Sequence, residues 1–588
     1  MFLKRPLLSL FLITFIVYCS SLFNQFVWDD EQFIYRNSFV QNFNVVSIFT
    51  QNTIAGAGEN SNYYRPLTTL SFAIDYQFWG LKPFGFHLVN TLLHIGAGLL
   101  LFLLLKQLGF EKPIGFVIAL IFLLHPLQTE AVTYANSRGD SMYSFFAMIS
   151  LLSLSWLFER QPPKFLIYEH QFALTKPWLA AISVISLAAA ILSKEIGLAV
   201  LGLYAWIIMY YFFQTAEKNF PTDIQKFTKE HSLALISFGT NVFVVSGYIW
   251  LRATVLNFEN TFNFYNDSSI YAQSLLVRLL TFTKIIFIYL RLIFVPSPLH
   301  MERNTSELFT PLNVWSPLFL LLILTLGVLS YLQWQRQKKI TIFFGWGWAA
   351  IMLVPVSGII AINGMLYEHW LYLPLIGFVI AMYGLLEFFC NKFLTSKVVF
   401  YLISTILLLF SVLTIRQNYL WGDPIRYYEY ILQFTDSARI HNNLAMTYAD
   451  RQQLNKALEH YQLALNYGQP YPQIYHNMGN TYVALNELDK AEANYKKALE
   501  LEPQFFHTYP FLIKLYLTEK KYPEALQVAD QALVFYPEMP DYQMLKLQVL
   551  AASGDTQNFE SYKKVLLTLY KTNSTAQRMI NSLQLTQE

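Results

Sequence analysis

The sequence has little charge and almost no cysteine. Charged residues make up 13% of its 588 positions, about half of the quarter typical of soluble domains, which argues against an ordinary soluble enzyme. The two cysteines, Cys19 and Cys390, both lie in apolar runs, so neither a disulfide framework nor a cysteine-based zinc site can be built. The net charge of +3 is small and spread along the chain, and we expect no nucleic-acid partner.

Apolar and aromatic residues are abundant, at 54% and 17%, which excludes intrinsic disorder. Charge is unevenly placed, since 33 of the 172 positions from Gln417 onward are charged, against 46 of the 416 positions before them. We therefore predict a membrane domain at 1–416, a linker at 417–437, a soluble repeat array at 438–573 and a C-terminal tail at 574–588.

Twelve apolar segments are candidates for crossing about 30 Å of hydrocarbon. They lie near 7–27, 86–105, 114–133, 142–158, 177–193, 196–213, 232–251, 275–297, 316–333, 340–361, 371–390 and 398–415. The first follows Lys4 and Arg5 as a signal peptide would, but no small-x-small cleavage site follows it, so we expect an uncleaved first helix.

Basic residues cluster in alternate loops, which the positive-inside rule places in the cytoplasm. The clusters are Lys4/Arg5, Lys106/Lys112, Arg160/Lys164/Lys176, Lys218/Lys226/Lys229, Arg336/Lys338/Lys339 and Lys392/Lys397. The alternation holds only if 275–297 makes no full crossing, for instance as a re-entrant or interfacial segment; otherwise the C-terminal part would be cytoplasmic. We predict an all-α membrane domain of about eleven crossings plus that one irregular segment.

The C-terminal part repeats every 34 residues. The recurring positions are Tyr448, Tyr482 and Tyr516, then Ala457, Ala491 and Ala525, then Ala464, Ala498 and Ala532. This period, with small residues where two helices cross, is the signature of the tetratricopeptide repeat (TPR) α-solenoid. We predict three clear repeats over 438–539 and a degenerate fourth, up to about 573, that caps the array.

Such an array has a concave groove that can bind extended polypeptide. Asn443 and Asn477 occupy equivalent positions in two repeats, whereas the third repeat has Phe511 there. Both amides could hydrogen-bond a peptide backbone, so both are candidate peptide-binding residues. They could also be ordinary solvated helix residues.

The loops opposite the basic ones contain nearly every unusual cluster of polar residues, and ionisable groups at membrane depth usually mark a site. The first outer loop, 28–85, begins with Asp29 and Asp30 between Trp28 and Phe33. A carboxylate here could act as general base on a hydroxyl acceptor, or could orient it. The pair could also bind a divalent cation or be solvated surface.

Arg138 and Lys194 could hold a phosphate against the membrane surface, although Glu130 and Glu195 could equally pair with them as structural ion pairs. Polar residues of the outer loops and helix ends could line the same site: Tyr64, Arg65, His87, His125, Glu130, Asp140, Glu195, Glu368, His369 and Tyr372. His87 and His94 share a helix face, but no third metal ligand follows at a suitable spacing. Hydrogen bonding between helices therefore fits these histidines better than a metal site.

The ordered set of these motifs resembles the transmembrane and TPR O-mannosyltransferase family, within the polytopic (GT-C type) glycosyltransferases that use polyprenyl-phosphate sugars. No single piece is specific, but the order and spacing over about residues 28–423 are. The pieces are Trp28-Asp29-Asp30, Tyr64-Arg65-Pro66-Leu67, His87-Leu88-Val89-Asn90 with Leu93-His94, His125-Pro126 with Glu130-Ala131-Val132, Arg138-Gly139-Asp140, Ser193-Lys194-Glu195-Ile196-Gly197, Glu368 with Leu371-Tyr372-Leu373-Pro374, and Trp421-Gly422-Asp423.

The resemblance implies an inverting transfer of mannose, or a related sugar, from a polyprenyl-phosphate monosaccharide to Ser or Thr hydroxyls of exported proteins. It implies that Asp29 is the base and that Asp30, where the wider class has Glu, assists or orients it. Arg138 and Lys194 would hold the donor phosphate, and the transfer would need no metal or other cofactor. The partners would be the lipid bilayer, the lipid-linked donor and acceptor polypeptides in the TPR groove.

The scarcity of cysteine and the chain length favour a bacterial plasma membrane, with the site and the repeats on the periplasmic side; the alternative is the endoplasmic reticulum membrane. Two other functions stay open. One is a glycosyltransferase that acts on a lipid-linked or envelope glycan, with the repeats recruiting partners. The other is a non-enzymatic membrane-anchored scaffold or a transporter, which gives no reason for acidic and basic motifs to gather on one face.

Overall fold

The computed structural model describes residues 2–583 apart from 160–163, 168–169, 216–219, 259–272, 304–313, 363, 365, 391–396 and 572–573. The chain forms two compact units, unit 1 at Met1–Tyr427 and unit 2 at Tyr428–Glu588. They divide inside the predicted linker 417–437, much of which is helical, since α18 ends at Trp421 and α19 spans Pro424–Ile431.

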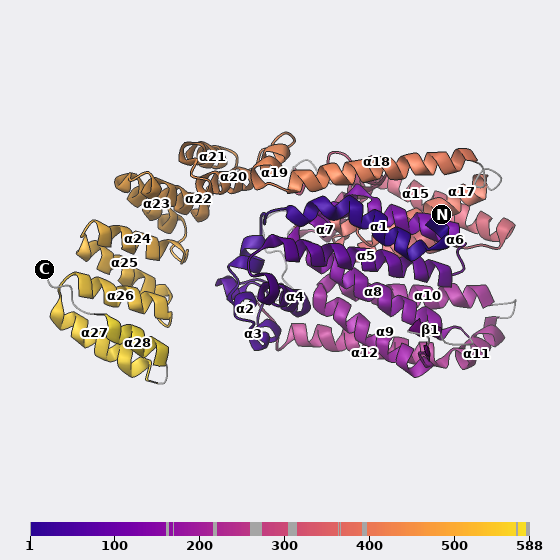
Figure 1. Cartoon of the computed structure of the whole chain (residues 1–588), viewed down its shortest axis with the longest axis horizontal. Helices are drawn as coiled ribbons and strands as arrows, with labels where there is room; N and C mark the ends of the chain where they lie inside the picture. Colours follow the sequence, from indigo (N-terminus) through magenta and orange to yellow (C-terminus); the bar gives the residue numbers. More distant parts are fainter. Residues whose placement is uncertain are drawn as a thin grey trace. The chain divides into compact units, whose positions relative to one another are not determined.

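Unit 1 is a bundle of apolar helices that run side by side (Figure 1). Several of them begin with proline, whose missing N–H costs no hydrogen bond in the first turn of a helix. The long helices are α1 (Pro6–Tyr18), α5 (Pro83–Gln107), α6 (Lys112–Leu124), α8 (Arg138–Leu157), α9 (Lys176–Ser193), α10 (Val200–Thr215), α11 (Phe220–Glu230), α12 (Ser232–Ala253), α14 (Leu275–Phe294), α15 (Trp315–Gln337), α16 (Thr341–Leu353), α17 (Pro374–Cys390) and α18 (Lys397–Trp421).

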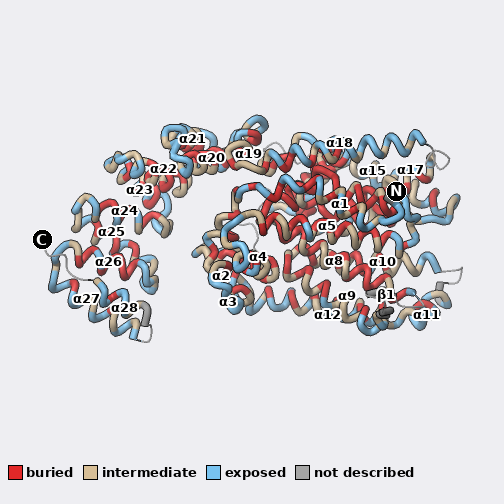
Figure 2. Tube along the Cα trace, in the orientation of Figure 1, coloured by how far each residue is buried: buried red, intermediate tan, exposed pale blue. Residues whose placement is uncertain are grey.

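Seven helices among the described residues are long and apolar enough to span a membrane. The number rises to eight if α6 and Pro126–Thr133, which are bent by 51° relative to each other, are counted as one span; α16 and α17 are shorter apolar helices. Of the 23 residues of α15 only Gln333 is buried, and most of α18 is exposed or intermediate, as its colours in Figure 2 show. Such apolar surface suits lipid contact, and the chain is a multi-pass membrane protein.

The end of unit 1 that contains residues 28–85 is called the outer end from here on. Helix α14, predicted as an irregular segment, is a continuous helix of 20 residues. Near its start, Arg278 Nε donates to the carbonyl of Gly358, between α16 and α17. Just beyond its end, Gln417 Nε2, near the end of α18, donates to Leu299 O. Both attachments are to outer-end segments, and an unbroken helix of 20 residues is about 30 Å long and cannot reverse its direction. Helix α14 therefore runs alongside these segments, which fits the interfacial alternative better than the re-entrant one.

A short antiparallel hairpin between α8 and α9 is the one departure from the all-α prediction among the described residues. It pairs β1 (Lys164–Ile167) with β2 (His170–Ala173), with Phe165 opposite Phe172. A two-stranded hairpin is too small to change the fold class, which is helical throughout the rest of the described chain.

The first outer loop is a folded cap with three helices, α2 (Ser38–Gln41), α3 (Val45–Thr50) and α4 (Pro66–Trp79). Its apolar core contains Phe33, Ile34 and Phe72, together with Phe86 of α5 and Ala135. The cap is therefore packed directly onto the outer end of the bundle.

The last long helix of unit 1 is tied to the first at this same end. Asn418 Nδ2 in α18 donates to Val17 O, and Asn24 Nδ2 donates to Asn418 O. Asn418 Oδ1 in turn accepts a hydrogen bond from Thr133 Oγ1 at 2.6 Å. The chain thus leaves unit 1 at the outer end.

Unit 2 contains four antiparallel helix pairs, which confirms the predicted TPR solenoid. The pairs are α20 (Ala438–Asp450) with α21 (Leu454–Asn466), α22 (Pro472–Ala484) with α23 (Leu488–Leu501), α24 (Thr508–Thr518) with α25 (Tyr522–Phe535), and α26 (Pro540–Ala552) with α27 (Thr556–Leu569). The recurring alanines, such as Ala457 and Ala491, are fully buried where helices cross. The predicted tail begins with α28 (Ser574–Ser582), whose Ile580 is also fully buried.

Candidate active site

The candidate site is built around one short segment, residues 129–140. Helix α6 ends at Leu124, and Pro126 begins a new 3-10 turn, since proline cannot continue a helix in its interior. The helix α7 (Thr129–Thr133) and a 3-10 turn (Ala135–Ser137) then lead into α8. The segment is buried except for Asn136, and it bonds to the acidic pair and to the cations described below.

The acidic pair divides into a half-buried and a fully buried carboxylate. The backbone N–H of Asp29 donates to Tyr134 Oη at 3.0 Å, and the Asp29 side chain is half-buried. Asp30 is fully buried; its Oδ2 accepts the N–H of Val27 at 2.9 Å and its Oδ1 accepts the N–H of Asn136 at 2.8 Å. Asp30 therefore fixes the loop, and Asp29 is the carboxylate with surface for a ligand.

The turn that presents Asp29 is strained. Trp28 has φ of 57°, in the left-handed region that bulky residues rarely adopt. Strain of this kind persists only where the surroundings hold it, and it is common at functional sites. Here Asp30 holds the turn in place, because it accepts hydrogen bonds from Val27 N–H, just before Trp28, and from Asn136 N–H of the supporting segment.

Arg138 has no exposed surface, and each of its nitrogens has a partner inside the protein. Nε donates to Asn90 Oδ1 at 2.7 Å, and the terminal nitrogens donate to Ser71 Oγ and Phe86 O and pair with Asp75. This geometry does not support the predicted contact between Arg138 and the donor phosphate. Arg138 is instead a structural cation that joins α4, α5 and α8.

Lys194 and Arg65 each pair with a carboxylate and keep some exposure. Lys194 Nζ lies 2.7 Å from Asp140 Oδ2, with the side chains 11% and 1% exposed. Arg65 Nε lies 2.9 Å from Glu195 Oε2, and Glu195 Oε1 accepts the N–H of Tyr64. The carboxylates hold the two cations in place while part of each cation stays accessible.

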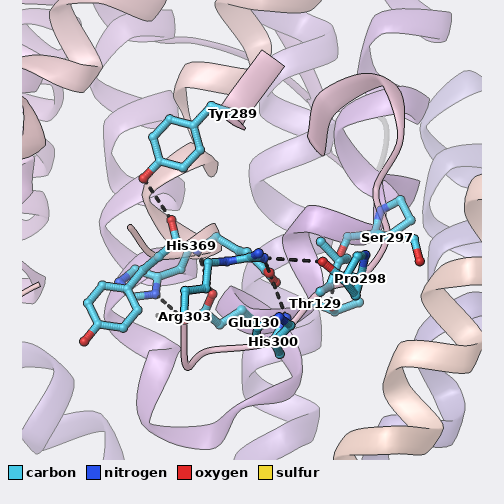
Figure 3. Close-up of polar contacts among 12 residues, drawn as sticks. Thr129, Glu130, Tyr289, Ser297, Pro298, His300, Arg303 and His369 are labelled. Carbon is cyan, nitrogen blue, oxygen red and sulfur yellow. Dashed lines mark hydrogen bonds and ion pairs between the residues drawn. The ribbon is translucent and has the colours of Figure 1, made fainter. Parts of the chain in front are cut away.

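A second group surrounds Glu130, as Figure 3 shows. Glu130 Oε2 accepts the backbone N–H groups of Glu368 and His369, at 2.9 and 3.1 Å, and its Oε1 lies 2.7 Å from His369 Nδ1. The Glu368 carboxylate pairs with Arg303 and accepts the N–H of His300. Glu130 therefore orders the turn at 368–371, and Glu368 holds a third cation.

Electrostatics joins these groups into one cluster. Burial and the charge of Lys194 lower the pKa of His369 to about 3, with Asp140 and Arg65 also acting on it. Burial lowers the pKa of Lys194, which Asp140 opposes. Burial raises the pKa of Glu368 against the opposing effect of Arg303, and burial raises the pKa of Asp30. His369 is therefore neutral at physiological pH.

Arg303 was missed by the sequence reasoning. A signal was available, because the positive-inside rule expects few basic residues in outer loops, and Arg303 follows the segment predicted to stay at the outer end. Asp75 was also missed, since a single acid on an amphipathic helix looks like a solvated residue.

Three predicted residues lie buried inside the bundle, and two of them make contacts between helices. His125 Nε2 donates to Ile293 O at 2.9 Å, and Tyr372 Oη contacts His94 Nδ1 at 2.5 Å. His87 is buried on α5. The contact of His94 with Tyr372 agrees with the interhelical role predicted for His87 and His94, and His125 makes a similar contact with α14.

Metal binding was left open by the acidic pair. Within the described ranges, no three His, Cys, Asp or Glu side chains are grouped so as to hold a metal ion. Both oxygens of Asp30 accept backbone N–H groups, so Asp30 is poorly placed to ligate one. Metal-independent transfer stays a prediction.

The two predicted peptide-binding residues of unit 2 differ. Asn477 is buried; its Nδ2 donates to Asn442 Oδ1 of the preceding repeat, and its Oδ1 accepts from Gln473. Asn443 is half-buried. The position of Asn477 between repeats does not support a peptide contact, while Asn443 stays a candidate.

Comparisons with known proteins agree with the two-part organisation. Residues 7–262 match the family described as dolichyl-phosphate-mannose-protein mannosyltransferase, and residues 436–504 match the tetratricopeptide repeat. The chain is 25% identical over 475 residues to the mouse "Protein O-mannosyl-transferase TMTC3", covering 77% of this chain and 50% of that protein. It is 25% identical over 483 residues to the Caenorhabditis elegans "Protein O-mannosyl-transferase F38B6.6", covering 80% and 64%.

The chain thus spans about half to two thirds of the length of these curated relatives. Among solved structures, the MamA protein matches with 17% identity and a TM-score of 0.24, over 26% of this chain and 84% of that one. The family matches and the curated relatives confirm the resemblance to protein O-mannosyltransferases and the presence of TPR repeats.

Proposed function

We propose that this protein transfers a mannose-like sugar from a polyprenyl-phosphate monosaccharide to Ser or Thr hydroxyls of polypeptides. The observation that carries the proposal is the segment 129–140, which bonds to Asp29 and Asp30 through Tyr134 and Asn136 and to Lys194 through Asp140. A candidate base and candidate phosphate ligands thus share one rigid support. The names of the relatives in the comparisons point to the same reaction.

Asp29 acts as the general base in this proposal. Its carboxylate removes the proton from the acceptor hydroxyl as the hydroxyl oxygen forms a bond to the anomeric carbon and the bond from that carbon to the phosphate oxygen breaks. The configuration at the anomeric carbon inverts because attack and departure occur on opposite faces. Asp30 is a positioning residue, since both its oxygens are used to hold the loop.

The leaving phosphate gains negative charge, and preorganised cations stabilise such charge best. The cations we assign to it are Lys194, Arg65 and Arg303, each held by a carboxylate partner and partly exposed. Arg303 and Arg65 replace Arg138, which was predicted to hold the donor phosphate. The polyprenyl tail stays in the bilayer.

The acceptor polypeptide is supplied by the repeats. The chain leaves unit 1 at the end where Asp29 lies, as the Asn418 contacts require, so we place the repeats on the same side of the membrane as the site. Capture of acceptor chains there raises their local concentration, so a weak affinity at the site suffices. We place this side outside the cytoplasm, in a bacterial plasma membrane or, alternatively, facing the lumen of the endoplasmic reticulum.

The test is transfer by the full-length chain in lipid vesicles, from radiolabelled polyprenyl-phosphate mannose to a Ser- and Thr-containing polypeptide. Labelled polypeptide in the wild type and none with Asp29→Asn supports the proposal. If label appears only on an added lipid-linked glycan, the acceptor is a glycan and not a polypeptide. If neither acceptor is labelled, the proposal is rejected.

A further inference from the structure

The side chain of His369 has a defined hydrogen-bond partner in the cluster but has no role in the proposed reaction. His369 Nδ1 lies 2.7 Å from Glu130 Oε1, and the other oxygen of Glu130 already accepts two backbone N–H groups. Burial raises the pKa of Glu130 to about 7, and the two backbone N–H groups oppose that rise. An ionised Glu130 is an acceptor only, and with that form Nδ1 carries the proton. The other ring nitrogen, Nε2, is then an acceptor of hydrogen bonds.

The ring is also fixed in direction. Tyr367 stacks on it, with ring centroids 5.3 Å apart and planes 21° apart, and Trp370 meets both rings edge-on. Tyr289 Oη, at 3.2 Å, donates to the carbonyl of Tyr367 and braces this pair from α14. The His369 side chain is 14% exposed, so a buried and immobile ring presents a small accessible edge.

The surroundings decide what such an acceptor can bind. A neutral imidazole nitrogen offers a lone pair, which repels phosphate oxygens and attracts O–H groups. Arg303, one of the cations assigned to the phosphate, pairs with Glu368, the residue directly before His369. Lys194 and Arg65 also act electrostatically on His369. We therefore place the sugar attached to that phosphate beside the ring. The donors that a hexose presents at that place are its hydroxyl groups.

We infer that His369 selects the transferred sugar by accepting a hydrogen bond at Nε2 from one of its hydroxyl groups, with Glu130 as the positioning residue that fixes the tautomer. The inference rests on the proposed function and names a specificity determinant within that site. It predicts that the enzyme discriminates against sugars that lack that hydroxyl.

The test compares the donor polyprenyl-phosphate mannose with analogues in which each free hydroxyl of the sugar is replaced in turn by hydrogen. For the wild type we expect kcat/KM to fall about five- to tenfold on one analogue, as loss of a hydrogen bond worth about 1 kcal/mol predicts. His369→Phe keeps an aromatic ring and removes Nε2. The kcat/KM of this variant on the parent donor should fall by a similar factor, and its kcat/KM on that analogue should be no lower than on the parent donor.

A matched control is His231→Phe, because His231 lies against Phe158 and Phe227 at the opposite end of unit 1. It should keep the wild-type pattern across all analogues. His369→Gln, which can place an amide oxygen near the former Nε2, should recover part of the discrimination.

Equal losses on every analogue in the wild type and in His369→Phe would overturn the inference while leaving the transfer reaction established. A wild type that shows no loss on any analogue would overturn it without the need for a variant. No transfer from any polyprenyl-phosphate sugar would instead reject the proposed function, and the inference with it.

Discussion

Replacement of Arg138 tests whether this cation stabilises the fold or binds the donor phosphate. In Arg138→Met the carboxylate of Asp75, whose side chain is 7% exposed, loses its ion-pair partner. Asn90 Oδ1, Phe86 O and Ser71 Oγ lose their donor as well. Removal of one partner of a buried pair typically costs about 3–5 kcal/mol, which is a large share of the stability of a protein.

We therefore expect Arg138→Met to lower the thermal unfolding temperature of the purified protein strongly, measured in detergent by intrinsic fluorescence. The double variant Arg138→Met/Asp75→Leu should recover much of that loss, because an apolar pair of similar volume often replaces a buried ion pair at little cost. It should also recover sugar transfer. A single variant with the unfolding temperature of the wild type and no donor binding would refute this reasoning and restore Arg138 as a phosphate ligand.

Three further predictions concern the site. Asp29→Asn should lower kcat about 100- to 10,000-fold, the usual contribution of a general base, with donor binding unchanged in a filter-binding assay; activity near that of the wild type would remove Asp29 from the mechanism. Lys194→Met should weaken donor binding and lower kcat while the unfolding temperature falls less than in Arg138→Met, and equal falls would argue that Lys194 is structural too. Burial raises the pKa of Glu368. At pH values above the ordinary glutamate pKa, the folded protein therefore binds more protons than the unfolded chain, and the free energy of unfolding should fall as pH rises. The unfolding temperature of Glu368→Gln should fall less with rising pH than that of the wild type. Parallel curves for the two proteins would show that the pKa of Glu368 does not change on folding.

The sequence predicted well those features that depend on local periodicity. Apolar runs predicted the membrane helices, and the period of 34 residues predicted where Ala457 and Ala491 are buried. Both patterns are written in neighbouring positions, so no knowledge of distant contacts is required.

The roles of the individual cations could not be predicted in this way. Arg138 and Lys194 look alike in sequence, and what separates them is Asp75 and Asn90, which come from two other helices. Asn477 shows the same limit, because the repeat period places it on a first helix, but its partner Asn442 belongs to the preceding repeat. Whether a polar group stabilises the fold or can bind a ligand depends on hydrogen-bond and ion-pair partners from distant segments of the chain.

The bonds of Asn418 have a mechanical consequence. The side-chain amide of Asn418 joins the end of α1, through Val17 O, to Thr133 in the segment that supports the candidate base and cations. The backbone carbonyl of Asn418 accepts from Asn24, shortly before the cap begins. Asn418 lies three residues before the end of α18, on the chain's path toward unit 2. A load carried along the backbone into α18 reaches Trp421, which stacks on Tyr134 with ring centroids 5.4 Å apart, before it reaches Asn418. Two side chains of the last turn of α18 therefore couple the path toward unit 2 to the segment that supports the candidate base.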